Sequence, residues 1–252
     1  MTTPDLTAAV AEYYRDGAEA WRGDELALHV ADLPGCSRAA WSRIQGLEQA
    51  VAPFATRVTW DVGHRYEAVI ADALRWWCKK NGWQFSHGGV VLLGLDDHGA
   101  LCAREPVEPN APPKQLAELA RRKRMLLGHP DFVLTDPDGA RYVVDTKWSG
   151  RFPKSGEPMP YDYRLKTAAY AFAVGAPRFT PFVYYGVKKR FDFAWEPTAA
   201  YVDDITKRVR ELLPLYDGVE PEADPPTHYA FNICNYCDAL DCPKNPDFRG
   251  AA

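Results

Sequence analysis

The sequence lacks several features that would assign it to a class at once. It has no apolar run long enough to cross a membrane, no internal repeat and no low-complexity segment. The polar start Met1-Thr2-Thr3-Pro4-Asp5 is not that of a secretory signal peptide, so we expect a cytoplasmic protein without membrane contact. Thiols stay reduced in the cytoplasm, and cysteines there bind metals more often than they form disulfides.

The chain also lacks an excess of charge of either sign. Its net charge is −4, and its 46% hydrophobic and 25% charged residues are typical of a globular protein. A protein that coats nucleic acid is usually strongly basic, but a nuclease cleft needs only local positive potential and bound cations. The net charge therefore does not suggest a protein that coats nucleic acid, but it does not exclude a nuclease. The length of 252 residues predicts a single domain spanning residues 1–252.

Apolar spacing and turn residues predict an α/β fold in which helices flank a mixed sheet. The predicted helices span residues 5–22, 37–50, 64–80, 114–127, 163–174 and 201–213. The predicted strands span residues 89–93, 131–135, 141–145, 182–187 and 190–195. Proline-rich stretches over 105–113 and 219–226 predict loops.

The clearest local pattern is a β-hairpin around Asp136-Pro137-Asp138-Gly139. Proline at the second position and glycine at the fourth suit a type I turn. In an antiparallel hairpin the first strand begins where the second ends, so Asp131 and Asp145 are expected to lie together. Because side chains alternate along a strand, Asp145 and Lys147 share one face and Thr146 points away.

Two carboxylates and a lysine on one patch suit the hydrolysis of a phosphodiester. Divalent cations held by carboxylates can activate water, neutralise phosphate charge and stabilise the leaving oxygen. A lone Asp145-Thr146-Lys147 is more simply explained as polar residues at a strand end. The preceding Pro130-Asp131 and the intervening hairpin make the arrangement more specific.

These residues resemble the PD-(D/E)xK nuclease superfamily, with Pro130-Asp131 as its first element and Asp145-Thr146-Lys147 as its second. The resemblance implies a restriction-endonuclease-like core over residues 61–215 and a bound Mg²⁺ or Mn²⁺. Asp131, Asp145 and the backbone carbonyl of Thr146 would hold the cation. Lys147 would orient or activate the attacking water.

Two further matches point to the RecB-like branch of that superfamily. His64 stands at the start of the preceding predicted helix, where that branch has an additional metal ligand, and Glu67 shares its helical face. The branch also has a Q-x-x-x-Y helix that contacts DNA or supports the catalytic lysine. Tyr170 matches it as a candidate catalytic residue, but Lys166 replaces the glutamine, so the role of that turn is open.

The six cysteines provide the remaining pattern. Three of them have the spacing C-x2-C-x4-C near the C-terminus: Cys234, Cys237 and Cys242. Three thiolates leave a four-coordinate metal centre one ligand short, and Cys36, in a turn, is the natural fourth. The alternative is a local zinc knuckle that uses His228 or Asp241, with Cys36 merely buried. Cys78 and Cys102 fall outside the set.

The whole ordered set resembles the iron–sulfur RecB-like exonucleases, notably the CRISPR-associated "Cas-four" type and phage relatives. That resemblance implies a [4Fe-4S] cluster on the four cysteines, in an annex formed by residues 30–60 and 227–243, with structural Zn²⁺ as the lesser alternative. It further implies a DNA exonuclease acting on single-stranded or processed ends in recombination, repair or CRISPR adaptation, with proteins of those pathways as partners. The competing hypothesis is an inactive nucleic-acid-binding or assembly module on the same fold.

Overall fold

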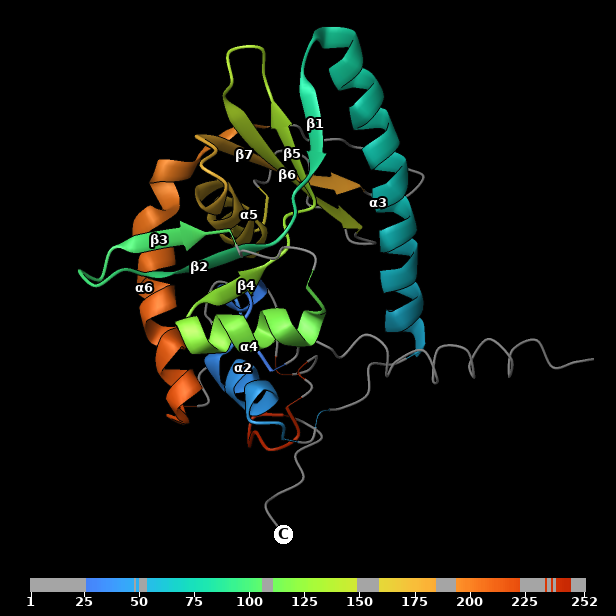
Figure 1. Cartoon of the computed structure of the whole chain (residues 1–252). Coiled ribbons are helices and arrows are strands. Elements are labelled where there is room, and N and C mark those ends of the chain that lie inside the picture. The colour runs from blue at the N-terminus through green and yellow to red at the C-terminus, as the bar shows by residue number, and fades with distance from the viewer. Residues whose placement is uncertain are drawn as a thin grey trace, which may run out of the picture.

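The structure is a computed structural model that describes residues 26–47, 49, 54–105, 111–148, 159–184, 194–222, 234, 237 and 239–245 (Figure 1). Its helices are η2 (Val30–Asp32), α2 (Ser37–Ile44), α3 (Phe54–Asn81), α4 (Pro113–Lys123), α5 (Tyr161–Ala173), η4 (Thr198–Tyr201), α6 (Val202–Leu212) and η5 (Leu213–Asp217). Its strands are β1 (Gln84–His87), β2 (Val91–Leu95), β3 (Leu101–Arg104), β4 (Leu126–Gly128), β5 (Phe132–Thr135), β6 (Arg141–Trp148), β7 (Arg178–Tyr184) and β8 (Glu196–Pro197). None of the described helices has the length and apolar composition needed to cross a membrane.

Within the described residues the strands form two sheets. The larger has the order β1-β5-β6-β7-β8, in which β6 and β7 are parallel and the other pairs are antiparallel. The smaller has the order β3-β2-β4 and is antiparallel throughout. The chain passes from β6 through α5 to the parallel strand β7, which is a βαβ connection. The expectation of an α/β fold with a mixed sheet is confirmed.

Helices cover both faces of the larger sheet because its central strands are apolar on both sides. Phe132 and Leu134 of β5 pack with Ala71 and Cys78 of α3. The alternate residue Val133 belongs to the cluster that includes α5. Figure 1 shows α3 running along one side of the hairpin, with α5 on the other side.

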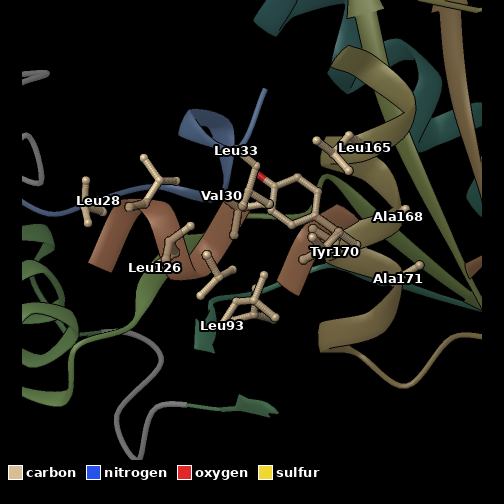
Figure 2. Packing of buried hydrophobic residues seen from close by; sticks show 14 of the residues in the cluster. Leu28, Val30, Leu33, Leu93, Leu126, Leu165, Ala168, Tyr170 and Ala171 are labelled. Atoms are coloured by element: carbon tan, nitrogen blue, oxygen red, sulfur yellow. The ribbon is translucent and has the colours of Figure 1, made fainter. Parts of the chain in front are cut away.

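Helix α5 lies at the centre of the molecule, in contact with strands of both sheets. It is buried around most of its circumference, and small residues such as Ala168 and Ala171 let its neighbours approach closely. Figure 2 shows Tyr170 pointing from this helix toward Val30 and Leu33. Its ring packs on Gly128, where an added Cβ would lie 2.8 Å from the Tyr170 ring, so this position requires glycine.

The predicted hairpin is confirmed as β5 and β6. The amide of Gly139 donates to the carbonyl of Asp136 at 3.0 Å, and Gly139 has a φ of +87°, a conformation that glycine adopts without strain. Strand β5 begins at Phe132, opposite Val144, whereas β6 continues to Trp148 alongside β7. The last part of β6 therefore extends beyond its antiparallel partner.

Two helix predictions were wrong at their ends. Helix α3 begins at Phe54, well before residue 64, and Gly63 lies inside it. One glycine costs a helix only about 1 kcal/mol, so it does not have to mark an end. Helix α4 ends at Lys123 rather than residue 127, since Arg124 takes a left-handed φ of 53° and the next residues pair with β2 as β4.

The remaining predictions differ mainly in their boundaries. The predicted helix over 37–50 stops at Ile44, the strand over 89–93 is shifted to β2, and the described part of the strand over 182–187 is the end of the longer β7. The strand over 190–195 was wrong in its described part, because β8 begins only at Glu196. The helix over 5–22 lies outside the described residues. Strands β1, β3 and β4 were not predicted.

Candidate functional site

The candidate site lies where β6 extends beyond β5. Because no β5 residue pairs with this end of β6, the backbone amide of Thr146 is available to a side chain, and it donates to Asp131 Oδ2 at 2.6 Å. The Thr146 hydroxyl donates to the same oxygen at 2.7 Å. Two donors thus fix one oxygen of Asp131 beside Asp145, as the hairpin register predicts.

Asp145 is a fully buried carboxylate between two lysines. Its relative exposure is 0%, Lys147 Nζ lies 2.5 Å from Oδ2, and Lys166 Nζ lies 3.5 Å from Oδ1. Apart from these two ammonium groups, no donor among the described residues reaches either oxygen. Burial acts to raise the pKa of Asp145, but the charges of Lys147 and Lys166 outweigh it and hold the pKa below its ordinary value.

Asp131 has the opposite shift. Burial and the neighbouring charge of Asp145 raise the pKa of Asp131 to about 6, against the opposing effects of Lys147 and the Thr146 hydrogen bonds. Two adjacent carboxylates whose pKa values move apart are typical of acid–base and metal sites, although structural ion pairs can produce the same shift.

Lys147 has the position that the alternation of β6 predicts. Besides its approach to Asp145, its ammonium donates to the backbone carbonyl of Thr146 at 3.0 Å. The same carbonyl and Asp145 Oδ2 are two of the oxygens expected to bind a metal ion. In this structure the Lys147 ammonium therefore provides the positive charge at those oxygens.

Lys166 and Tyr170 lie on α5. This helix packs between the two sheets and contacts β6, so it brings both side chains to the site. Lys166 Nζ lies 5.2 Å from the centroid of the Tyr170 ring. Tyr170 is only 4% exposed and its hydroxyl is hydrogen bonded to the main chain of His129, two residues before Asp131. This burial favours the supporting role of Tyr170 over direct contact with DNA.

Glu67 is a site residue to which the sequence reasoning gave no role. It is half-buried on α3, and burial raises its pKa, while the charges of Lys147, Asp145 and Lys166 act on it as well. Its i+3 spacing from His64 was the only sequence signal. His64 itself is exposed one turn earlier on the same helix.

The donor set suits a hard divalent cation in its chemistry. Asp145 supplies two buried oxygens that face only the ammonium groups of Lys147 and Lys166 among the described donors, and Asp131 keeps one oxygen away from the Thr146 donors. However, no three His, Cys, Asp or Glu side chains of the described residues are gathered closely enough to hold a metal ion. The arrangement is that of two carboxylates neutralised by lysines, with Glu67 nearby.

All six cysteines lie in described residues, and none forms a disulfide. Cys36 is the residue before α2, Cys234 and Cys242 are buried, and Cys237 is partly buried. Burial, followed by the neighbouring thiols of Cys36 and Cys242, raises the pKa of Cys234. Cys36 and Cys242 thus each lie within electrostatic range of Cys234, although no gathered metal group is found among the described residues.

Charged side chains attach the C-terminal segment to α2. Asp241 accepts hydrogen bonds from Arg38 at 2.7 Å and from Ser42 at 2.5 Å, and Arg38 also pairs with Glu220. Gln49 and Ala239 form an isolated antiparallel bridge. We call these contacts between residues 36–49 and 234–245 the junction. Asp241 has protein hydrogen-bond partners in the junction, so its position is explained without a metal-binding role.

Comparison with protein-family models and with curated proteins gives no match. Among solved structures, the chain is similar to one described as "Crystal structure of SSO0001", with a TM-score of 0.57 and 13% sequence identity. The similarity covers 96% of this chain and 98% of that one. At this identity the likeness shows a shared fold only, and it agrees with the α/β architecture described above.

Proposed function

We propose that the protein is a metal-dependent DNA exonuclease of the PD-(D/E)xK kind. The observation that carries the proposal is the meeting of Asp131, Asp145 and Lys147 at one end of the β5–β6 hairpin. The buried Asp145 carboxylate is compensated here by the ammonium groups of Lys147 and Lys166, and a buried carboxylate of this kind requires such positive charge or a bound cation.

Each residue has a distinct role in this proposal. Asp131 and Asp145 would hold Mg²⁺ or Mn²⁺, with the Thr146 carbonyl and His64 as further ligands. The cation would activate water and stabilise charge on the phosphate. Thr146 holds one oxygen of Asp131 with two hydrogen bonds, which leaves the other for the cation. Lys147 carries a protonated amine beside these oxygens, where it can orient water or a phosphate oxygen.

The finer fold features belong to the same proposal. Residues 61–215 would form a restriction-endonuclease-like core, and residues 30–60 and 227–243 an annex carrying a [4Fe-4S] cluster on Cys36, Cys234, Cys237 and Cys242. The junction supports the annex, because it brings residues on either side of the core together. The pKa shift of Cys234 supports the proximity of three of these thiols.

The proposed substrate is DNA with free or single-stranded ends. Its processing in recombination, repair or CRISPR adaptation, together with proteins of those pathways, rests on the sequence resemblance alone. Terminal labels placed at either the 5′ or the 3′ end of single- and double-stranded oligonucleotides would report both activity and polarity in Mg²⁺ or Mn²⁺. Stepwise shortening by the wild type, abolished in Asp145→Asn, is the expected result. No shortening with either cation would overturn the proposal.

The second candidate is an inactive nucleic-acid-binding module. The observation in its favour is that two ammonium groups already neutralise Asp145. Binding of the same oligonucleotides, measured by fluorescence anisotropy, without any shortening in either cation would support it. Binding that is equal in wild type and Asp145→Asn would strengthen that conclusion.

A further inference from the structure

Lys166 differs from Lys147 in what holds its ammonium group. It projects from α5, the buried helix between the two sheets, and its ammonium lies near the face of the Tyr170 ring as well as near Asp145 Oδ1. Its side chain is 19% exposed. The position of this positive charge is thus set by a helix in the core, not by the end of a strand.

The two oxygens of Asp145 are divided between the two lysines. The Lys147 ammonium contacts Oδ2 and the Thr146 carbonyl, which are the oxygens proposed to bind a cation. A cation bound there would therefore replace the Lys147 ammonium. Lys166 takes Oδ1 and competes for none of the other proposed ligands. It can remain in place when one cation binds.

A second divalent cation would need Oδ1. Paired cations in hydrolytic sites lie about 3.5–4 Å apart, which requires a carboxylate shared between them. Among the described residues, Asp145 is the fully buried carboxylate of the site, and both of its oxygens face ammonium groups that a cation could replace. Because Lys166 Nζ lies 3.5 Å from Oδ1, a cation that approached this oxygen from the same side, to about 2.1 Å, would have to displace the ammonium.

The local charge leads to the same conclusion. Three carboxylates, those of Glu67, Asp131 and Asp145, face the two ammonium groups of Lys147 and Lys166. With Lys147 displaced by the first cation, that cation and Lys166 balance the three carboxylates, whereas a second cation beside Lys166 would leave two positive charges in excess in a partly buried site. Such an excess is costly because buried like charges are weakly screened.

We propose that the ammonium of Lys166 takes the place of a second divalent cation, so that the site binds one cation per chain. This inference rests on the proposed function, because it assumes that Asp131 and Asp145 bind a cation. It makes Lys166 a positioning residue that sets the metal stoichiometry. Its effect does not depend on DNA.

Titration of the full chain with Mn²⁺ in a calorimeter, without DNA, tests the inference. The wild type is expected to bind one Mn²⁺ that is lost in Asp145→Asn. Lys166→Met, which keeps the length of the side chain and removes its charge, is expected to bind two. Lys166→Arg is the matched control and is expected to bind one. Circular dichroism of each variant verifies that it is folded.

The outcomes separate the two hypotheses. A single Mn²⁺ site in both wild type and folded Lys166→Met overturns this inference and leaves the proposed function standing. Two sites in the wild type, both lost in Asp145→Asn, also overturn this inference and leave the proposed function standing. This outcome can be observed even if no Lys166 variant folds. Binding that is absent from the wild type, or unchanged in Asp145→Asn, overturns the proposed cation site and the inference with it.

Discussion

The carboxylate–lysine site and the junction join distant parts of the chain by different means. At the site, Asp131 meets Thr146 across 15 residues, and the backbone register of one hairpin brings them together. At the junction, Asp241 meets Arg38 across 203 residues, and in the described part of this region the connection is made by charged side chains and one isolated backbone bridge. The first region is set by backbone geometry, whereas the second depends on a few charged groups.

This difference separates chemistry from stability. The site gathers buried charges of both signs, an arrangement that contributes little net stability and is retained where it has a function. The junction gathers polar contacts far from Asp145, and its loss would free one segment from another. We therefore expect substitutions at the site to affect cleavage first and substitutions at the junction to affect unfolding first.

The largest expected effect is that of Asp145→Asn on cleavage. This change keeps the shape of the side chain and removes the charge proposed to bind the cation, so the loss of rate should exceed the roughly 10- to 100-fold typical of residues that only orient a ligand. Initial rates of end-labelled DNA shortening measure it. Asp138→Asn, at the exposed turn of the same hairpin, is the control and should keep the wild-type rate. Equal rates in the two variants would contradict the assignment of Asp145.

The next effect concerns the proposed cluster at the junction. Cys36→Ala should lower the iron and sulfide content per chain and the melting temperature, because a link between segments so far apart in sequence stabilises by on the order of several kcal/mol. Cys102→Ala, a partly exposed cysteine outside the set, should change neither. If Cys36→Ala kept a full complement of iron and a wild-type melting temperature, Cys36 would not be a ligand. The C-terminal segment would then be a self-contained metal knuckle.

Asp241→Asn should have a smaller effect on stability. It weakens the contacts with Arg38 and Ser42, and hydrogen bonds to charged groups contribute about 1.5–3 kcal/mol each when partly buried. Asp217→Asn is the matched control, because its pair with Arg124 is exposed and should contribute less to stability. Urea unfolding compares the two variants. If Asp241→Asn lost cleavage at temperatures where it is folded, the junction would affect chemistry as well as stability. That result would contradict the distinction between the two regions.

The last expected effect is a pH dependence of stability at the site, which appears only over a narrow pH range. Since the pKa of Asp131 is raised from 3.8 to about 6, the folded chain keeps a proton between these values that the unfolded chain has released. The contribution of Asp131 to stability therefore falls as the pH rises from 4 to 6, by about 2–3 kcal/mol in total. Unfolding of wild type and Asp131→Asn without added metal should show this difference. A difference that grows with pH over this range would contradict the shift.

The sequence predicts the site better than its surroundings, for physical reasons. The hairpin follows from Pro137 and Gly139 in its turn, and its register then places Asp131 by Asp145 without further information. The approach of Lys166 to Asp145 depends on how α5 packs between two sheets, which a local pattern does not contain. The same holds for Glu67, whose role depends on where α3 crosses the end of β6.

The missed strands have similar causes. β1 is short, polar and mostly exposed, so it lacks the alternation that marks a half-buried strand. β4 follows α4 directly through Arg124, whose left-handed conformation has no sequence signal because the residue is not glycine. In both cases pairing with a strand distant in sequence decides the structure.

The long separation at the junction also affects how the protein is made. Ribosomes add about 5–20 residues per second, so α2 waits on the order of ten seconds or more after its own synthesis before Asp241 exists to bind it. The hairpin is complete within a few seconds of its first residue. During translation the proposed catalytic carboxylates can therefore assume their positions while Arg38 and Ser42 still lack their partner, and closure of the junction is a late step in folding.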